Sequence, residues 1–454
     1  MCGLVGTFKG CADEVEKGLK KIAHRGPDGS GTAVHGDMIH GHVRLAVLDP
    51  TVASAQPFRY RDSVLSYNGE LWNHQELRTE LETLGHKFRT CGDTEVVAAA
   101  LYEWGPEAFP RLDGMFALAW SKKDDCLLAR DRFGKIPLYV FRKGGGFRWA
   151  SERKAFDSGG YMSPLPPGSW LDLRTGRLHE WYRVEEHLGA KADPLEALEQ
   201  AVHKRLVADV PVCCLISGGL DSTLILTLAK KYHPDIAAYT AYFDPDSEDL
   251  KYARLICKEL SVPLVEVRLV GFPPEALIRA IRTIEIPTKA QVEISLLCLP
   301  LAARIREDGF KVCLSGEAAD ELFGGYGNMC IQGSKADDAV WRIIRLRQLE
   351  KMSRGNFIRC NKVFMAHGVE CRLPFMEKDL VETVLAMGKS ECPPGKKLLK
   401  QIAKGIIPDQ VIKRRKETFQ GGSGISQIVS QIICYPNRFF NAECRELFGA
   451  ITTG

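Results

Sequence analysis

Apolar and polar positions alternate in short stretches over the first part of the chain, as they do in β-strands. These stretches are rich in β-branched and aromatic residues and occupy residues 41–50, 62–73, 114–134 and 146–152. Between them, residues 75–85 and 94–105 carry apolar positions at helical spacing. Strands that alternate with a few helices in this way predict an α/β domain in which sheets are sandwiched between helices.

The pattern changes between residues 163 and 195. Prolines and polar turns occupy residues 163–182, and a strongly helical stretch follows them. We place a domain boundary near residue 190, which predicts a first domain of residues 1–189 and a second domain of residues 190–454.

Beyond this boundary, apolar strands alternate with helices. The predicted strands are residues 210–216, 236–243, 263–269 and 310–315, and the predicted helices are residues 223–232 and 249–260. This alternation predicts a second α/β domain built on a doubly wound parallel sheet. From about Asp337 the pattern is mostly helical, which predicts a helical C-terminal part.

The composition excludes some classes of protein. The 454 residues are 45% hydrophobic and 26% charged, which is typical of globular domains. The net charge is +4, from 61 basic and 57 acidic residues, so neither nucleic acid nor a membrane surface is indicated as the main partner. The sequence has no apolar run long enough to span a bilayer and no secretory leader, which together predict a cytoplasmic protein.

Cysteine is frequent, with 15 residues, but no CxxC pair is present. Zinc and thioredoxin-type sites are therefore not indicated, and most of the cysteines are expected to be reduced core residues. Cys2 has an alternative role because it directly follows Met1. Removal of Met1 would place a thiol and a free α-amine on the same carbon, which makes a nucleophile with its own base.

The motif SGGLDS at residues 217–222 lies between a predicted buried strand and a predicted helix. Its glycines allow the backbone to approach an anion, its serines supply hydroxyl donors, and the helix that follows supplies free N–H groups. Asp221 can hold a magnesium ion against the phosphates. The alternative is a simple turn, but the complete six-residue motif favours a phosphate site. The motif is not a Walker A loop, because no GKS or GKT sequence follows it.

A second acidic motif, LSGEAADELFGGY, occupies residues 314–326 after another apolar strand. Glu317, Asp320 and Glu321 fall in this turn, and carboxylates at a strand end suit a metal ion and a polarised substrate. The alternative is a helix N-terminus enriched in acidic residues. That alternative explains one carboxylate, but it does not explain why Ser-Gly-Glu, Asp-Glu and Gly-Gly-Tyr occur together in this motif.

In this order, SGGLDS, SGEAADELFGGY, MAHGVECRLPFME and RRKETF resemble the synthetase domain of the asparagine synthetases. The segments MCGLVG, HRGPDG, GHVRLAVLD, YNGELWN, GDTE and ARDRFG resemble the glutaminase domain of the N-terminal-nucleophile amidotransferases. The resemblance covers about residues 1–425 and is to the glutamine-hydrolysing kind, because Cys2 is present. It implies an N-terminal αββα Ntn-hydrolase sandwich and a C-terminal domain of the ATP-pyrophosphatase type.

For the first domain, the resemblance implies that Cys2 attacks the side-chain amide of glutamine and that its own α-amine is the base. The residues implied to form the rest of the glutamine site are Asn68 and Gly69 for the oxyanion, Arg44 for the α-carboxylate, and Glu70 and Asp93 for the α-ammonium. The alternatives are a surface arginine for Arg44, a helix N-cap for Asp93 and a turn for the NGE segment.

For the second domain, the resemblance implies an ATP site with bound magnesium. The residues implied to bind ATP are Leu215, Ser217, Gly218, Gly219, Asp221, Ser222, Ser315 and Gly316. Asp221 and Asp320 would bind Mg2+, Glu317 would face the acyl-adenylate, and Lys416 would neutralise charge on the phosphates. The alternative for Lys416 is a solvated face of the basic run 413–416.

The implied reaction has two halves. Glutamine is hydrolysed at Cys2 through a thioester, and the ammonia passes through an interior channel to an acyl-AMP formed from ATP with release of pyrophosphate. Aspartate is the first choice of acceptor, and a homodimer is plausible by analogy. A different carboxylic acid stays open, because residues 285–295 depart from the usual asparagine synthetase version and Glu377 replaces a usual aspartate.

Two other classes of enzyme share one of these domains. A ligase that joins a substrate's own amine to its acyl-adenylate has no need of a glutaminase, so Cys2 argues against it. A sugar-phosphate amidotransferase does not adenylate its substrate, so SGGLDS argues against that class.

Overall fold

The computed structural model describes residues 1–157, 162–189, 192–286, 288–414, 425 and 429. The chain divides into two compact units, one built mainly from Met1–Arg183 and the other beginning at Val184. The predicted boundary between residues 189 and 190 stays a prediction, since residues 190 and 191 lie outside the described part.

The first unit contains two six-stranded sheets. The first sheet has the order β10-β8-β9-β1-β3-β2, with β1 (Gly3–Phe8), β2 (Gly29–His35), β3 (Met38–Arg44), β8 (Tyr139–Lys143), β9 (Gly146–Ala150) and β10 (Ser163–Pro164). The second has the order β12-β11-β7-β6-β5-β4, with β4 (Phe58–Tyr60), β5 (Ser63–Leu71), β6 (Gly114–Lys122), β7 (Asp125–Arg130), β11 (Ser169–Asp172) and β12 (Leu178–Glu180). All the strand pairs in both sheets are antiparallel.

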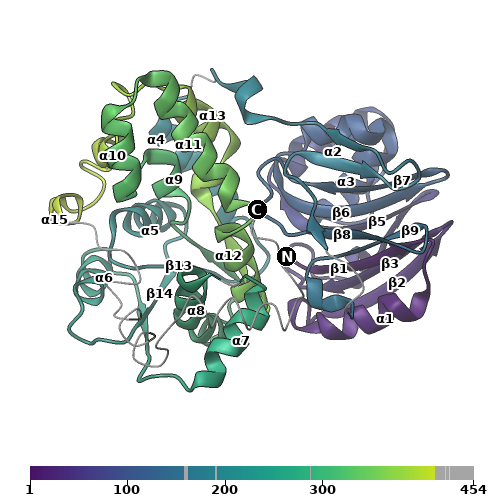
Figure 1. Cartoon of the computed structure of the whole chain (residues 1–454), viewed down its shortest axis with the longest axis horizontal. Helices are drawn as coiled ribbons and strands as arrows, with labels where there is room; N and C mark the ends of the chain where they lie inside the picture. The colour runs from purple at the N-terminus through teal and green to yellow at the C-terminus, as the bar shows by residue number, and fades with distance from the viewer. Residues whose placement is uncertain (158–161, 190–191, 287, 415–424, 426–428, 430–454) are drawn as a thin grey trace. The chain divides into compact units, whose positions relative to one another are not determined.

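The helices of this unit cover the two outer faces. Helix α1 (Ala12–Lys21) packs on β1 and β3, whereas α2 (His74–Thr83) and α3 (Asp93–Trp104) pack on the second sheet (Figure 1). Short 3-10 turns are η1 (Ala23–Arg25), η2 (Val52–Ser54), η3 (Gly105–Arg111) and η4 (Arg153–Ala155). Strands β1, β2 and β3 face β5 across the middle, which gives the order helix, sheet, sheet, helix. This confirms the predicted αββα sandwich.

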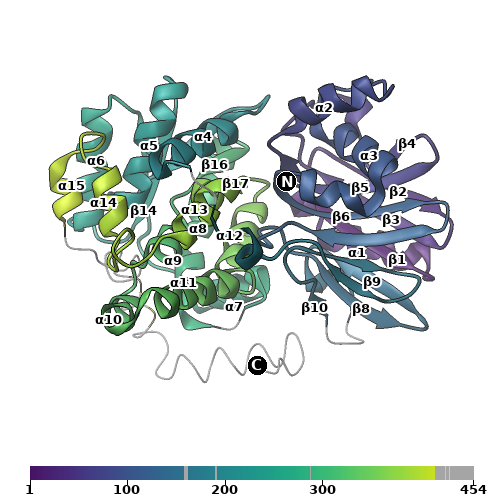
Figure 2. The ribbon, with the colours of Figure 1, turned by 90° about the horizontal axis from the view of Figure 1, so that it is seen from above.

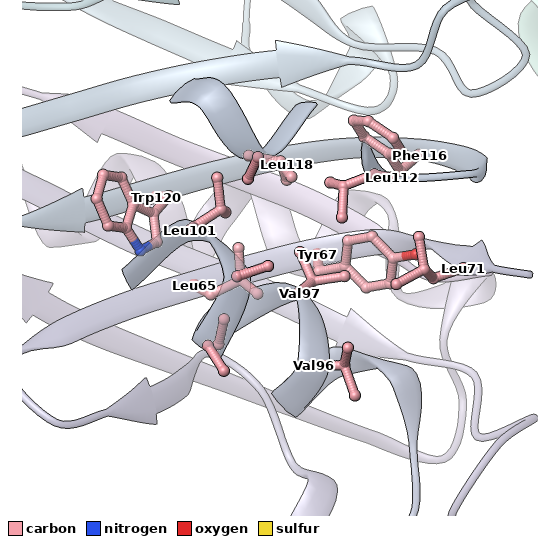
Figure 3. Packing of buried hydrophobic residues seen from close by; sticks show 14 of the residues in the cluster. Leu65, Tyr67, Leu71, Val96, Val97, Leu101, Leu112, Phe116, Leu118 and Trp120 are labelled. Carbon is pink, nitrogen blue, oxygen red and sulfur yellow. The ribbon is translucent and has the colours of Figure 1, made fainter. Parts of the chain in front are cut away.

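A hydrophobic core lies between α3 and the second sheet. Val97 and Leu101 of α3 face Leu65 and Tyr67 of β5, and all four side chains are buried (Figure 3). Burial of each such aliphatic side chain contributes roughly 2 kcal/mol. Because side chains alternate along a strand, the odd-numbered residues of β5 point into this core and Asn68 points toward the first sheet.

The second unit contains a five-stranded sheet in the order β15-β14-β13-β16-β17. The strands are β13 (Val212–Leu215), β14 (Ala237–Tyr242), β15 (Leu264–Arg268), β16 (Val312–Leu314) and β17 (Glu370–Arg372). Every pair is parallel, and the order reverses between β13 and β16, which confirms the predicted doubly wound sheet. Figure 2 shows β14, β16 and β17 of this sheet among the helices of the unit.

Helices connect and flank these strands. They are α4 (Pro194–Leu206), α5 (Leu220–Tyr232), α6 (Glu248–Glu259), α7 (Pro274–Ile284), α8 (Lys289–Glu307), α9 (Ala319–Phe323), α10 (Gly327–Lys335), α11 (Asp338–Met352), α12 (Asn356–Met365), α13 (Lys378–Ala386), α14 (Lys397–Ile402) and α15 (Asp409–Lys413), with 3-10 turns η5 (Val184–His187) and η6 (Pro374–Met376). In the described part of the chain, no helix combines the length and the apolar character needed to cross a membrane.

One expectation about strands was wrong, whereas the mostly helical C-terminal part is confirmed. The strand predicted at residues 41–50 ends at Arg44, where the chain leaves the sheet. The helical region after Asp337 contains β17, which has three residues and no periodic pattern of its own. It is a strand because Cys371 and Arg372 pair with Cys313 and Leu314 of β16.

Glu377, the departure noted in the sequence, is a buried structural residue. Its carboxylate accepts hydrogen bonds from Lys204 Nζ at 2.9 Å and from Arg205 Nη1 at 2.7 Å, both of α4. Burial alone would raise the pKa of Glu377, but the attraction of Arg205 and Lys204 lowers it to about 2. The residue therefore ties η6 and α13 to α4.

Candidate active sites

Cys2 lies at the interface between the two sheets of the first unit. It directly precedes β1 and is 7% exposed. Its backbone N–H donates to Asn68 Oδ1 at 2.7 Å, and its thiol donates to the carbonyl of Leu45 at 3.7 Å. The packing of one sheet on the other therefore brings the nucleophile predicted at the N-terminus to the amide predicted for the oxyanion.

Gly69 follows Asn68 in β5 and pairs with Phe116 of β6. A Cβ atom at this position would lie 2.3 Å from the carbonyl oxygen of Met115, so only glycine fits. The N–H groups of Tyr67 and Leu71 donate to Gln56 Oε1 and Asp93 Oδ2, away from β6. By the two-residue period of a strand, the N–H of Gly69 points the same way, where it can donate to a bound oxyanion.

Arg25 holds the main chain of Cys2, a role that sequence reasoning missed although the residue lies in the quoted HRGPDG segment. Its Nε donates to the carbonyl of Cys2 at 2.9 Å, and its Nη1 donates to Glu152 Oε1 at 2.8 Å. Burial would raise the pKa of Glu152, but Lys154, His24 and Arg25 hold it well below its ordinary value. A buried ion pair thus fixes the residue that carries the thiol.

The carboxylate of Asp93 reaches β5. Asp93 Oδ2 accepts the N–H of Leu71 at 2.9 Å and the hydroxyl of Tyr67 at 3.3 Å. The N-cap of α3 is Gly92, so the alternative in which Asp93 is only a helix cap is wrong. Glu70 is buried on the same strand, two residues beyond Asn68.

Arg44 ends β3, immediately before Leu45, whose carbonyl contacts Cys2. Its Nη1 donates to the carbonyl of Thr51 at 2.7 Å and its Nη2 to the carbonyl of Asp49 at 2.5 Å. The guanidinium therefore orders the loop after β3, and its role toward a glutamine carboxylate stays a prediction.

The two motifs of the second unit meet at the switch point of its sheet. SGGLDS follows β13 and SGEAAD follows β16, and these neighbouring strands are parallel. A Cβ atom on Gly316 would lie 2.9 Å from the backbone nitrogen of Ser222, so the two loops touch. The crevice at a switch point, outside the carboxyl ends of the strands, is where open α/β sheets bind ligands.

The loop after β13 has the geometry of an anion site. Gly218 has a φ of +71°, and Ser222 Oγ accepts the N–H of Ser217 at 3.1 Å. The N-cap of α5 is Gly219, which supplies no side-chain cap to this 13-residue helix, and the N-terminus of a helix is suited to bind an anion. Leu215 is the last residue of β13, at the base of the loop.

The two predicted metal ligands face a single lysine that sequence reasoning missed. Lys396 Nζ lies 2.5 Å from Asp221 Oδ2 and 2.8 Å from Asp320 Oδ1. Burial alone would lower the pKa of Lys396, but the attraction of Asp221 and Asp320 raises it above its ordinary value. Carboxylates from two loops are thus brought close enough to share one cation.

This pair of carboxylates suits magnesium. Within the described ranges, no group of three or more His, Cys, Asp or Glu residues could hold a metal ion. Mg2+ commonly uses one or two carboxylates together with waters and substrate phosphates, so Asp221 and Asp320 beside an anion-binding loop are sufficient.

The backbone of Lys396 is held in the left-handed region, with a φ of +58°. Its N–H donates to the carbonyl of Phe323 at 3.1 Å, and the N–H of Gly395 donates to the carbonyl of Gly324 at 2.8 Å. The segment is therefore fastened to the end of the 314–326 motif. The available sequence signal was weak, a Pro-Gly turn before a lysine in PPGKK.

Glu317 is held by two side chains of α12. Asn356 Nδ2 donates to Glu317 Oε1 at 3.0 Å, and Arg359 Nη2 donates to Glu317 Oε2 at 2.8 Å. Ser315 Oγ accepts the N–H of Glu317 at 3.3 Å. Lys416 lies outside the described residues.

The first unit thus contains a thiol beside amide donors, and the second contains an anion loop beside a pair of carboxylates. Two separate sites of these kinds are what an ATP-dependent ligase requires when it takes nitrogen from glutamine and fixes it on another substrate.

Comparison with known proteins agrees with this class. Residues 1–165 match the family described as glutamine amidotransferase domain, and residues 194–338 and 331–433 match the family described as asparagine synthase. The chain belongs to the asparagine synthase family, as its motifs predict, and it is an ATP-dependent ligase with a glutamine amidotransferase domain.

Curated relatives match almost the whole chain. Asparagine synthetase B [glutamine-hydrolyzing] of Escherichia coli strain K12 is 33% identical over 94% of this chain and 83% of the relative. Asparagine synthetase [glutamine-hydrolyzing] 1 of Arabidopsis thaliana is 31% identical over 94% of this chain and 79% of the relative. Asparagine synthetase [glutamine-hydrolyzing] of Asparagus officinalis is 31% identical over 94% of this chain and 78% of the relative.

Proposed function

We propose that this protein transfers ammonia from glutamine to a carboxylic acid, with aspartate as the acceptor and asparagine as the product. The observation that carries this proposal is the meeting of SGGLDS and SGEAAD at the switch point, where Gly316 touches Ser222. That arrangement supports the proposal, because N–H and hydroxyl groups, a pair of carboxylates and Glu317 follow two neighbouring strands, as adenylation of a carboxylate requires.

In the first half-reaction, removal of Met1 frees the α-amine of Cys2. The amine takes the proton of the thiol, and the thiolate attacks the side-chain amide of glutamine. Asn68 and the N–H of Gly69 stabilise the oxyanion that develops, while Arg44, Glu70 and Asp93 hold the amino-acid end. Ammonia leaves, and water hydrolyses the thioester to glutamate.

In the second half-reaction, the acceptor carboxylate attacks the α-phosphorus of ATP and pyrophosphate leaves. The loop from Ser217 to Ser222 and the first turn of α5 bind the phosphates. Magnesium held by Asp221 and Asp320 would supply charge neutralisation there. Ammonia then displaces AMP from the acyl-adenylate, with Lys416 near the phosphates and Glu317 facing the acyl group.

An enclosed path between the sites would keep the ammonia reactive. Free ammonia in water near neutral pH is mostly protonated and therefore not nucleophilic. The identity of the acceptor rests on the names of the relatives, and a different carboxylic acid is the second candidate because residues 285–295 depart from the usual sequence.

The test compares the wild-type protein with Cys2→Ala, using Cys11→Ala at an exposed cysteine as the matched control. AMP and pyrophosphate are measured with a panel of acids, with glutamine or with ammonium chloride as the nitrogen source. We expect Cys2→Ala to lose the glutamine-dependent product and keep the ammonium-dependent one. Release of ADP and orthophosphate would contradict the adenylation chemistry, and a response to another acid but not to aspartate would contradict the acceptor.

Intact-mass analysis tests the first step independently. The purified wild-type chain should lack Met1, because only a free α-amine on Cys2 can act as its base. A fully active protein that keeps Met1 would contradict this role.

A further inference from the structure

Two carboxylates at the end of β16 share one amide donor. Asn356 Nδ2 lies 3.0 Å from Glu317 Oε1 and 2.9 Å from Glu321 Oε1. An amide nitrogen has two hydrogens, so it can donate one to each carboxylate. Asn356, the first residue of α12, therefore sets how these two acidic side chains lie relative to one another.

Gln291, in the first turn of α8, sets the orientation of that amide. Gln291 Nε2 donates to Asn356 Oδ1 at 2.7 Å. With its oxygen directed to Gln291, Asn356 must direct its nitrogen to Glu317 and Glu321. The reverse orientation would place Asn356 Oδ1 against two carboxylate oxygens and its nitrogen against the donor of Gln291.

Two further side chains restrain the same carboxylates. Arg359, which is 4% exposed, donates from Nη2 to Glu317 Oε2 at 2.8 Å. The hydroxyl of Tyr326 donates to Glu321 Oε1 at 2.7 Å, and Glu321 is 3% exposed. Because the cluster is partly buried and closely hydrogen-bonded, a change in one amide alters the position of the others.

Gln291 belongs to residues 285–295, the segment that departs from the usual version of the family, whereas Glu317 belongs to a motif that matches it. Gln291 Oε1 is buried and accepts no hydrogen bond from any described residue. The donor nitrogen of Gln291 is therefore the part of this side chain that the cluster uses.

We propose that Gln291 is a positioning residue for Glu317, acting through Asn356, and that it thereby controls capture of the acyl acceptor. This inference rests on the proposed function, in which Glu317 faces the acyl group. It assigns a role in acceptor handling to a residue of the variant segment that reaches Glu317 through the amide of Asn356.

The test distinguishes the effect of the hydrogen-bond donor of Gln291 from the effect of the size of its side chain. Gln291→Lys keeps a hydrogen-bond donor for Asn356 Oδ1. Gln291→Glu instead places a carboxylate oxygen against Asn356 Oδ1, and because neither oxygen can donate, Asn356 must turn or move away. Gln291→Met removes the donor without adding charge. Gln332→Glu, at an exposed position of α10, is the matched control for an added carboxylate.

We expect kcat/KM for the acceptor acid to fall at least about tenfold in Gln291→Glu and Gln291→Met, the effect of losing a hydrogen bond that acts on a charged group. Gln291→Lys and Gln332→Glu should stay near the wild-type value. KM for ATP and the glutaminase rate at Cys2 should be unchanged in all four variants, which a general loss of folding would not allow. An unchanged acceptor kcat/KM in Gln291→Glu, or an equal loss in Gln291→Lys, would overturn the proposal.

Crystal structures of the free variants give a second readout that needs no acceptor. The contact between Asn356 and Glu317 should persist in Gln291→Lys and be lost in Gln291→Glu. Its persistence in Gln291→Glu would overturn the positioning role. If the wild-type protein releases pyrophosphate with no acid at all, the proposed function fails, and these structures still decide whether Gln291 positions Glu317.

Discussion

Replacing Lys396 by methionine removes a buried charge and leaves most of the side-chain volume. The ammonium lies 2.5 Å from Asp221 Oδ2 and 2.8 Å from Asp320 Oδ1, and Lys396 is 4% exposed. In Lys396→Met, the two carboxylates face each other across an apolar group. Their mutual repulsion then acts directly on the contact between the loops that follow β13 and β16.

The size of the effect follows from the burial of the group. Breaking a buried ion pair by removing one partner costs about 3–5 kcal/mol. The side chains of Asp221 and Asp320 are 21% and 18% exposed, so water screens part of this loss and about 2–3 kcal/mol is expected. For a unit of this size, that corresponds to a fall in Tm of roughly 5–10 °C.

Magnesium should reverse the loss. The two carboxylates of Lys396→Met have no ammonium between them, so a divalent cation can bind there without competition and stabilise the folded state. Thermal unfolding is measured by fluorimetry in EDTA and in millimolar Mg2+, without ATP. The matched control is Lys397→Met, which removes the same charge from the exposed neighbouring position.

We expect Mg2+ to raise the Tm of Lys396→Met more than that of the wild type or of Lys397→Met. A Tm of Lys396→Met equal to that of the wild type in EDTA would refute the role of Lys396 as a bridge. An equal response of all three proteins to Mg2+ would refute the view that Lys396 occupies the place of the cation.

Asn68→Asp keeps the acceptor for the nitrogen of Cys2 and loses the amide donor, so glutaminase kcat should fall about 100- to 1,000-fold while ammonium-dependent ligation persists. The lowered pKa of Glu377 gives roughly 3 kcal/mol of stability that is fully present above about pH 4.5 and is lost as the pH falls toward about 2. Urea unfolding should therefore show Glu377→Gln less stable than the wild type at neutral pH, with a difference that narrows below about pH 4.5. Leu101→Ala removes a fully buried side chain of α3 and should destabilise the first unit by about 2–5 kcal/mol in the same assay.

A different result would contradict each of these three predictions. Equal loss of glutamine-dependent and ammonium-dependent activity in Asn68→Asp would indicate misfolding and not loss of an oxyanion donor. A stability difference for Glu377→Gln that is the same at every pH would show that the charge of Glu377 does not matter. Destabilisation of Leu101→Ala by less than about 1 kcal/mol would contradict the packing of α3 on β5.

The regular elements were largely predictable from the sequence because their patterns are local. The alternation in residues 62–73 corresponds to β5, and the helical spacing in residues 94–105 corresponds to α3. A strand that the sequence did not predict lacks such a pattern. Strand β17 exists only because β16 lies beside it, and such pairing depends on contacts between distant residues.

The site residues divide in the same way. Cys2, Asn68 and Asp221 were predicted because each lies in a contiguous motif whose chemistry can be interpreted locally. Arg25, Asn356 and Lys396 had no assigned role, because each acts on a residue that is distant in the chain. A long-range hydrogen bond leaves no periodic trace in the sequence.

The sequence by itself determined the two kinds of fold and predicted a nucleophile and a phosphate loop, since strand and helix periods and short motifs are properties of neighbouring residues. Only the tertiary structure decided what these groups contact. Packing of one sheet on another brought Cys2 to Asn68, and the switch in strand order brought the loop at Ser222 to Gly316. The tertiary structure also showed that Lys396 lies between Asp221 and Asp320. Two carboxylates that are taken out of water require a cation beside them, and in this fold the ammonium of Lys396 supplies that charge.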